Sequence, residues 1–450
     1  MNFSELFIAR IVKLRSEKLQ EADLIQVRKC LLDYLGVTAA GSMMLKDKAA
    51  VYLKSQDERN GNIPLPGMRN KTTLLNSAFI HGMYSHVAEL DDGERFAMMH
   101  PGAPLFSVLL PAWIRFGFTS EQFEKAVLCG YEASILLARA MQPQLKIRGY
   151  HGTGITGTIG AAIGLGIALD FTQKQLLDVL SAACTSASGI LKVIKDESVM
   201  KPLNVAFAAQ QAISAVLVVK AGFTGADDVL GGNNGFIRAY SGVEASDTID
   251  VWEQIQKPAI HGIYVKPYAS CRHCHAPVEA ALKLRRMGSF NSDEIEKIIV
   301  KTHLLAIDGH DHTEIRGINS AKMSIPYCVA SALKTGSGFI DAFTDTYIKN
   351  PYLSGLVSKT GVEESPEMTK KAPAERSASV TLFFKDQRNQ QTVTVIHPKG
   401  EPENPVTDSE LKQKTESLMR YAGYNDETIL KLTDAFSHTF DLDAVKYYYM

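Results

Sequence analysis

Carboxylates and histidines gather in one short stretch of the sequence, residues 86–104 (HVAELDDGERFAMMHPGAP). Three acids, Glu89, Asp91 and Asp92, follow an apolar run with helical spacing, and a proline directly follows His100. Acids at a helix C-terminus oppose the helix dipole and do not stabilise the helix end, and a solvated acidic turn is the alternative to a functional role. An imidazole titrates near neutral pH, and proline restrains its backbone. We therefore expect His100 to carry a proton, the acids to end the helix and frame the site, and Glu89 to orient a histidine.

A second histidine, His151, lies in a glycine-rich tract, residues 148–154 (RGYHGTG), that opens an Ala/Gly-rich helix. Backbone amides at a helix N-terminus attract anions. Lys201 precedes a proline at the start of another expected helix, where the helix dipole disfavours its positive charge. His151 and Lys201 are therefore candidates for taking or delivering a proton, although an exposed lysine and a structural loop histidine are the alternatives.

Residues 266–275 (KPYASCRHCH) allow two interpretations. Cys271 and Cys274, with histidines beside them, resemble half of a zinc site, but no second ligand pair follows at a suitable spacing. We therefore expect no metal. In the favoured interpretation Arg272 binds an anion and His275 acts as an acid or base.

The remaining candidate is Tyr327, near the start of an otherwise apolar helix. Its default role is in the core with a satisfied hydroxyl, and the alternative is to position substrate. The sequence offers no phosphate loop, nucleotide motif or strong metal cluster. Histidines, lysine and arginine without such motifs favour cofactor-free proton chemistry on a small anionic substrate.

Composition narrows the class of protein. The chain has 450 residues, 45% hydrophobic and 22% charged, which predicts a globular protein of about two domains. A formal net charge of -1 argues against nucleic-acid binding. Residues 1–20 lack the pattern of a signal peptide, so the six cysteines are expected to be reduced in the cytoplasm. Residues 154–171 and 205–222 are apolar but short and interrupted, so we expect buried helices and no membrane span.

Hydrophobic periodicity changes along the chain. Residues 1–265 read as successive helices, and a strand at 294–303 and a hairpin at 377–397 follow. Helices are expected again at 320–335, 407–421 and 426–437. The prediction is a mainly α fold: a large all-helical domain (1–265), a smaller inserted α/β lid domain (266–400) and a C-terminal return to the helical domain (401–450).

Five segments, taken in order, resemble the MmgE/PrpD family, which includes 2-methylcitrate dehydratases, cis-aconitate decarboxylases and iminodisuccinate epimerases. They are HVAELDDG…HPGAP, RGYHGTG, KPLN, KPYASCRHCH and AKMSIPYCVA. The resemblance spans about residues 5–400. It implies a helical domain with an α/β lid, a homodimer, and a metal-free site in the cleft between the domains. It also places the catalytic residues, at His100, His151, Lys201, His275 and Tyr327.

Four positions depart from the family pattern. Glu89 stands where the family has aspartate, and Asn204 where it often has histidine. Gly93, which we expect to let the chain turn, and Glu94 replace a Thr-Trp pair common in its dehydratases and decarboxylases. The longer acid at position 89 is the first suspect for a changed substrate.

These observations predict a metal-independent lyase, a decarboxylase or dehydratase, acting on a small di- or tricarboxylic acid of the citrate/cis-aconitate type. His151 or Lys201 would move a proton at the carbon α to a carboxylate, with His100 as the partner acid. Arg272, with the lysine, would stabilise carboxylate or enolate charge, and Tyr327 would position it. The alternative is an epimerase or racemase of an amino- or imino-dicarboxylate such as iminodisuccinate, and a third hypothesis is a helical scaffold without activity.

Overall fold

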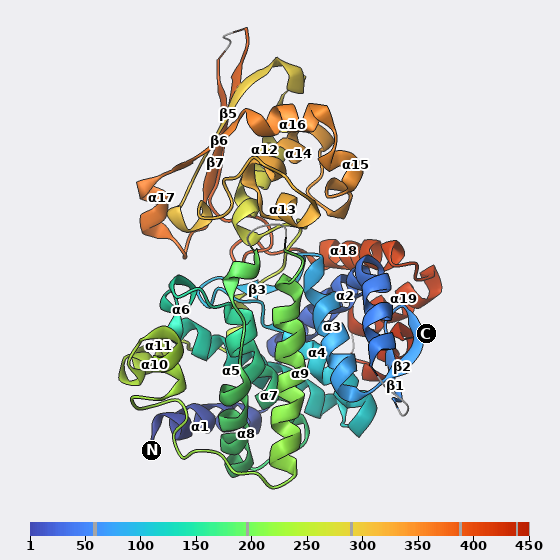
Figure 1. The fold of residues 1–450 in the computed structure, drawn as a ribbon, viewed down its shortest axis with the longest axis vertical. Helices are drawn as coiled ribbons and strands as arrows, with labels where there is room; N and C mark the ends of the chain where they lie inside the picture. Colours follow the sequence, from blue (N-terminus) through green and yellow to red (C-terminus); the bar gives the residue numbers. More distant parts are fainter. Residues whose placement is uncertain (57–60, 195–197, 289–290, 387–388, 438–439, 450) are drawn as a thin grey trace.

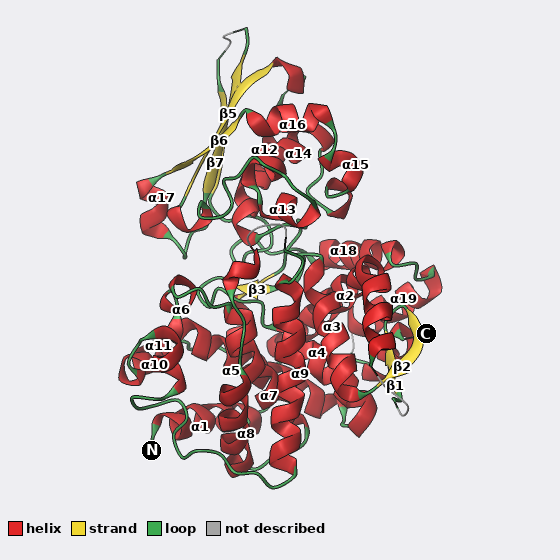
Figure 2. Cartoon of the chain, viewed as in Figure 1, coloured by secondary structure: helices red, strands yellow, loops and turns green. Residues whose placement is uncertain are grey.

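The computed structural model describes residues 1–449 except 57–60, 195–197, 289–290, 387–388 and 438–439. A large helical body carries a smaller α/β unit at one end (Figure 1). Helices dominate and strands are few (Figure 2), so the predicted mainly α fold is confirmed. One cluster of buried hydrophobic residues lies within the body, and another fills the α/β unit and includes a few residues of the body, such as Val37 and Leu418.

Helices α1 to α11 form most of the helical body. They are α1 (Phe3–Ser16), α2 (Glu21–Ser55), α3 (Leu74–Val87), α4 (Gly102–Phe116), α5 (Ser120–Met141), α6 (Gln144–Ile147), α7 (Gly152–Ala168), α8 (Gln173–Ser186), α9 (Lys201–Lys220), α10 (Phe236–Ser241) and α11 (Ile249–Glu253). Polar N-caps begin several of them; Thr119, for example, forms a capping box with Gln122 at α5.

Two small antiparallel sheets interrupt the body, which the sequence had predicted to be all helical. Strands β1 (Ile63–Leu65) and β2 (Met68–Thr72) form a hairpin. Strand β3 (Gly93–Glu94) pairs with β4 (Ile263–Tyr264), which brings the segment after α3 to the point where the chain enters the α/β unit.

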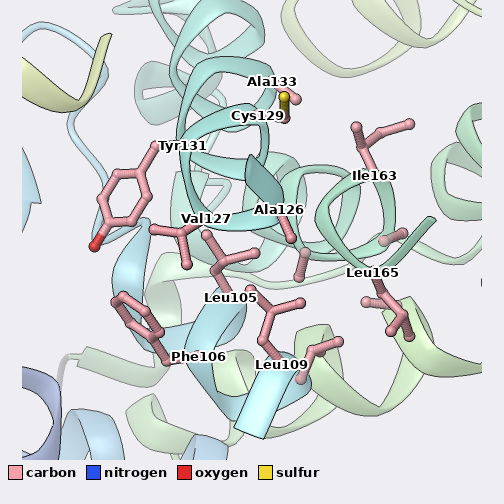
Figure 3. Close-up of a cluster of buried hydrophobic side chains, with 14 of the residues drawn as sticks. Leu105, Phe106, Leu109, Ala126, Val127, Cys129, Tyr131, Ala133, Ile163 and Leu165 are labelled. Atoms are coloured by element: carbon pink, nitrogen blue, oxygen red, sulfur yellow. The ribbon is translucent and has the colours of Figure 1, made fainter. Parts of the chain in front are cut away.

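Helix α7 packs tightly on α5 in the centre of the body. A Cβ atom on Gly160 would lie 2.6 Å from the carbonyl oxygen of Gly130, and one on Gly164 would lie 3.0 Å from that of Ala126. Only glycine permits this approach of the two backbones. Apolar side chains of α4, α5 and α7 fill the space around it (Figure 3).

Helix α9 and helix α7 correspond to the two apolar segments of the sequence. Among the described residues, α9 is the helix long and apolar enough to cross a membrane. More than half of its apolar window is buried, and it packs against α3, α7 and α8. Helix α7 is buried along its whole length. Both helices thus serve as core helices of the body.

The α/β unit contains a four-stranded sheet of order β6-β5-β7-β8. Its strands are β5 (Ile295–Thr302), β6 (Thr360–Glu364), β7 (Ala378–Phe384) and β8 (Gln391–Val395). β5 runs parallel to β6 and antiparallel to β7, which pairs with β8 as the predicted hairpin. Alternate side chains of β7 are buried, so helices cover one face of the sheet.

Six helices complete the α/β unit: α12 (His275–Met287), α13 (Ile318–Met323), α14 (Ile325–Thr335), α15 (Asp345–Ile348), α16 (Pro351–Ser358) and α17 (Pro366–Lys371). The chain then returns to the body as α18 (Asp408–Tyr421), α19 (Asp426–Ser437) and α20 (Val445–Tyr448). α18 and α19 pack against α2 (Figure 1).

Candidate active site

The segment that follows α3 is held in an unusual backbone conformation. The helix ends at Val87, so the acids lie beyond it, which corrects their expected place at the helix end. Glu89 adopts a left-handed conformation with φ of 57°. The Lys322 ammonium donates to the carbonyls of Val87 (3.0 Å) and Ala88 (3.3 Å). Such strain persists where surrounding contacts over-determine it, and it clusters at functional sites.

Three histidines meet beside this segment. The ring centroid of His86 lies 5.1 Å from that of His100 and 5.7 Å from that of His151. They come from α3, from the approach to α4 and from the N-cap of α7. His100 and His151 were predicted from the sequence as site residues, and the fold brings them together with His86.

Asp91 fixes two of these imidazoles. Its Oδ2 atom lies 2.7 Å from Nδ1 of His86 and 3.4 Å from Nδ1 of His100. The carbonyl of Asp92 also lies 2.5 Å from Nδ1 of His100. Because carboxylate and carbonyl oxygens only accept, both Nδ1 atoms carry hydrogen, and each Nε2 is left as a base.

His151 has the opposite tautomer. The Asn204 amide nitrogen lies 3.1 Å from Nδ1 of His151 and 3.3 Å from the carbonyl of Ile190. An amide N–H₂ that donates to both makes Nδ1 the acceptor, so Nε2 of His151 carries the hydrogen. The site therefore holds one imidazole that donates from Nε2 and two that accept there.

Burial keeps two of these imidazoles, those of His100 and His151, uncharged at neutral pH. It lowers the pKa of His100 to about 3, even though Asp91 opposes the shift. Burial, with His86 and Lys201 adding repulsion, also holds the pKa of His151 well below its usual range. Burial alone would raise the pKa of the Asp91 carboxyl, but the neighbouring His100 and His86 lower it.

Lysines form the other side of the site. Lys201, the first residue of α9, pairs with one oxygen of Glu89. The fully buried Lys266 lies 3.4 Å from the other oxygen and 3.8 Å from Asp91. Burial also lowers the pKa of Lys322 to about 8, against the attraction of Glu89. Glu89 thus holds lysines, and Asp91 orients the histidines, which corrects the role predicted for Glu89.

Asp92 lies behind the histidines. It accepts from the hydroxyl of Tyr131 and, at 3.1 Å, from the backbone N–H of Gly102 at the start of α4. Burial raises the pKa of its carboxyl to about 7, although both hydrogen bonds oppose this. Asp92 therefore frames the site from the helix N-terminus.

Gly93 has a different function from the predicted turn. It lies in β3 with no left-handed backbone, and a Cβ there would come within 2.3 Å of the Tyr264 hydroxyl oxygen. Glycine is needed here because the tyrosine ring packs directly on the backbone.

The side chains of Arg272 and His275 are both hydrogen-bonded within the protein, so neither is free to bind an anion. The guanidinium of Arg272 donates to Glu401 at 2.7 and 3.1 Å and, at 2.8 Å, to Nδ1 of His275. The other nitrogen of His275 lies 3.2 Å from the carbonyl of Ser270. Both side chains are thus engaged in a buried network that joins the α/β unit to the returning chain, which corrects their expected roles as free anion and proton groups.

Tyr327 is placed in the core of the α/β unit. Its hydroxyl donates to the carbonyl of Ala342 at 2.8 Å, and its ring packs against Phe343. The side chain is 1% exposed. This geometry matches the default core role and gives no contact with the histidine cluster among the described residues.

Sequence reasoning did not assign roles to His86, Lys266, Lys322 or Asn204. His86, Asn204 and Lys322 lie inside quoted motifs, and Lys266 begins the KPYASCRHCH segment, so motif membership was the available signal. Lys322 approaches α3 from the α/β unit. Contacts between segments so distant in sequence follow from the tertiary fold.

The site contains a small cavity of about 20 Å³ between the two parts of the molecule. Lys201, Glu89 and Val87 line it from the body, and Lys322 and Asn319 from the α/β unit. That volume suits about one water molecule. A larger hollow of about 620 Å³ elsewhere on the body lacks these charged groups, so size alone does not locate the site.

No group of three or more His, Cys, Asp or Glu side chains within the described part of the chain is arranged to hold a metal ion.

Two family models match the chain, the MmgE/PrpD N-terminal domain over residues 7–248 and the MmgE/PrpD C-terminal domain over 268–437. The chain belongs to the MmgE/PrpD family. The resemblance seen in the five motifs is thereby confirmed.

Curated relatives of this MmgE/PrpD protein share low identity over most of its length. A cis-aconitate decarboxylase-like protein oryM of Aspergillus oryzae is 26% identical, covering 88% of this chain and 86% of its own. The cis-aconitate decarboxylase of Aspergillus terreus is 23% identical, with 88% and 85% covered. The cis-aconitate decarboxylase of Mus musculus is 21% identical, with 81% and 76% covered.

Proposed function

We propose that this protein is a metal-independent lyase that decarboxylates a small unsaturated tricarboxylic acid of the cis-aconitate type. The observation that carries the proposal is the meeting of three lysines with three histidines of defined tautomer around one strained segment. The names of the relatives favour decarboxylation over dehydration. The comparisons give no support to the epimerase alternative.

The charges of the lysines in the site explain why we propose a substrate with several carboxylates. Lys201, Lys266 and Lys322 face two carboxylates, those of Glu89 and Asp91, so positive charge is in excess on the lysine side. In a buried site, where the effective dielectric is low, that excess attracts a carboxylate more strongly than it would in water. Substrate carboxylates would bind the lysines that Glu89 now occupies.

Decarboxylation then needs charge stabilisation and one proton. Loss of CO₂ leaves an electron pair that delocalises through the alkene onto a remaining carboxylate, where Lys201 and Lys266 would stabilise it. A histidine protonates the resulting carbanion. Substrate anions near His100 and His151 would raise the depressed pKa values of these histidines, so substrate binding itself would bring the proton.

Substrate entry would require separation of the α/β unit from the body. The cavity of about 20 Å³ is too small for an acid with three carboxylates. Lys322 and Asn319 would move with the α/β unit and return when the site closes. Closure would exclude water from the carbanion.

The test is product analysis by NMR in D₂O with cis-aconitate, citrate and 2-methylcitrate as separate substrates. We expect CO₂ release from cis-aconitate and one new C–D bond in the product. Gain or loss of water without CO₂ release would make the protein a dehydratase. Turnover of none of the three acids would overturn the substrate class.

A charge variant tests the lysine side of the site. Lys266→Gln is expected to raise the KM for the tricarboxylate by about tenfold or more, because one buried charge-assisted contact is lost. Lys283→Gln, at a partly exposed lysine on α12 that pairs with Glu279, is the matched control and should leave KM unchanged. Equal KM values for the two variants would contradict lysine binding of substrate.

A further inference from the structure

A thiol–imidazole pair lies in the α/β unit beside the proposed site. Sγ of Cys271 is 3.1 Å from Nε2 of His310. Nδ1 of His310 is 3.0 Å from the carbonyl of Asp308, which can only accept. Nδ1 therefore carries a hydrogen, and Nε2 is left to take the proton of the thiol. A nucleophile, a base and a group that orients the base are thus in line.

Two more histidines extend this pair. The ring centroid of His273 lies 5.1 Å from that of His310 and 5.4 Å from that of His303. His303 is 2% exposed, and its Nδ1 has no hydrogen-bond partner among the described residues. Lys146 of the body approaches Nε2 of His273 at 3.5 Å. The proposed reaction at the carboxylic acid uses none of these groups.

The pKa of the Cys271 thiol is shifted in the opposite direction from those of the other cysteines whose pKa is shifted. Burial alone would raise the pKa of its thiol, but the charge and hydrogen bond of His310, aided by Lys201 and opposed by Glu89, lower it to about 6. Cys271 is partly exposed, whereas the other five cysteines are buried. Burial raises the pKa of four of these: Cys30, Cys129, Cys184 and Cys274.

We propose that Cys271, with His310 as its proton partner, is a covalent modification site for electron-poor alkenes, namely α,β-unsaturated carbonyl compounds. The sulfur electron pair forms a bond to the β-carbon of the alkene, and the alkene π pair moves to the α-carbon. The imidazolium of His310 gives its Nε2 proton to that carbon and becomes neutral. The new S–C and C–H bonds replace the S–H bond and the alkene π bond, so the addition needs no oxidant and no further reactant.

A modification of Cys271 would affect the proposed active site through backbone contacts. The N–H of Cys271 donates to the carbonyl of Lys322 at 2.9 Å, and the Lys322 side chain lines the small cavity. Arg272, the next residue, joins the α/β unit to Glu401. An adduct on the sulfur would push these segments apart and prevent closure. The modification itself does not depend on which acid is the substrate.

The first experiment labels the full-length protein with N-ethylmaleimide and follows each cysteine by peptide mass mapping. We expect Cys271 to react first. Exposure alone could explain that order, so the deciding measurement is the pH dependence of its rate. A rate that is half-maximal near pH 6 and flat above neutral pH supports the pair. A rate that still rises through pH 8, or earlier labelling of another cysteine, overturns it.

Variants sharpen the assignment to His310. His310→Asn should move the half-maximal pH of labelling upward by at least about one unit, because the thiolate loses its cationic partner. His397→Asn, at a partly exposed histidine on the chain that returns to the body, is the matched control and should leave the profile unchanged. An unchanged profile in a folded His310→Asn protein contradicts the pair. The pH profile of the unaltered protein remains a test if that variant fails to fold.

Discussion

The helical body and the α/β unit each contain a cluster of three histidines, with different partners. In the body, Asp91 and backbone or amide groups assign a hydrogen to one nitrogen of each ring, and lysines stand opposite. In the α/β unit, His310 is held by a backbone carbonyl and faces the sulfur of Cys271. The same residue type therefore suits proton transfer to carbon in one cluster and activation of a thiol in the other, because the partner decides where the proton lies.

The largest difference between the two clusters is expected when one histidine in each is replaced by asparagine. His151→Asn should lower kcat by about 10²–10⁴, the usual contribution of a general acid or base. His303→Asn should leave kcat close to that of the unaltered protein, since His303 belongs to the thiol cluster. Steady-state kinetics on the acid identified by NMR provides the measurement. Comparable losses in both variants would show that the two clusters do not have separate functions.

A smaller effect is expected when the carboxylate partner is removed. Asp91→Asn should lower kcat by about tenfold to a hundredfold, because His86 and His100 lose the group that orients them. Asp91 also raises the pKa of His100, so the alkaline side of the pH profile of kcat, where a proton donor loses its proton, should move to lower pH.

Asp92→Asn is the control for that variant, since its side chain bonds Tyr131 and Gly102 instead of a histidine. It should leave the position of the pH profile unchanged. A fall in kcat for Asp91→Asn without any movement of the profile would point to a structural role for that residue.

The last prediction concerns stability in acid, where both clusters should behave alike. Burial lowers the pKa of His100 and that of His303 to about 3, below the ordinary value near 6.5. The unfolded chain therefore binds more protons between these values, so the free energy of unfolding falls as pH drops below about 6.5. Each group contributes at most about 1.4 kcal/mol per pH unit.

Urea denaturation between pH 4 and 8 measures this dependence, with stability expressed as the free energy of unfolding. His100→Asn and His303→Asn should each make the decline between about pH 6.5 and 4 less steep. A slope that neither variant changes would mean that these histidines are not buried in neutral form.

Much of the fold could be predicted because its signals are local. The strand at 294–303, the hairpin at 377–397 and the two C-terminal helices appear as β5, β7–β8, α18 and α19. The parallel strand β6 (Thr360–Glu364) was not predicted, because its partner β5 lies about sixty residues earlier and its own sequence lacks clear alternation. The strands β3 and β4, of two residues each, carry too little pattern to detect.

Part of the candidate site could also be predicted, because some of its residues lie in local sequence motifs. Local motifs identified His100, His151 and Lys201 as groups that could handle protons or charge, and these lie together. Arg272 and Tyr327 were also named from local sequence, but their partners Glu401 and Ala342 are supplied by folding. Residue type indicates what a side chain can do, whereas its partners decide whether it is free to do it.

The sequence by itself determined the mainly α architecture, the family and the kinds of groups available for chemistry, because periodicity, caps and ordered motifs are encoded by neighbouring residues. Tertiary structure alone decided that Glu89 binds two lysines, that Asp91 orients the histidines, and that a thiol meets an imidazole in the α/β unit. The physical reason is that hydrogen bonds and ion pairs depend on distances of a few ångströms, which join residues far apart along the chain.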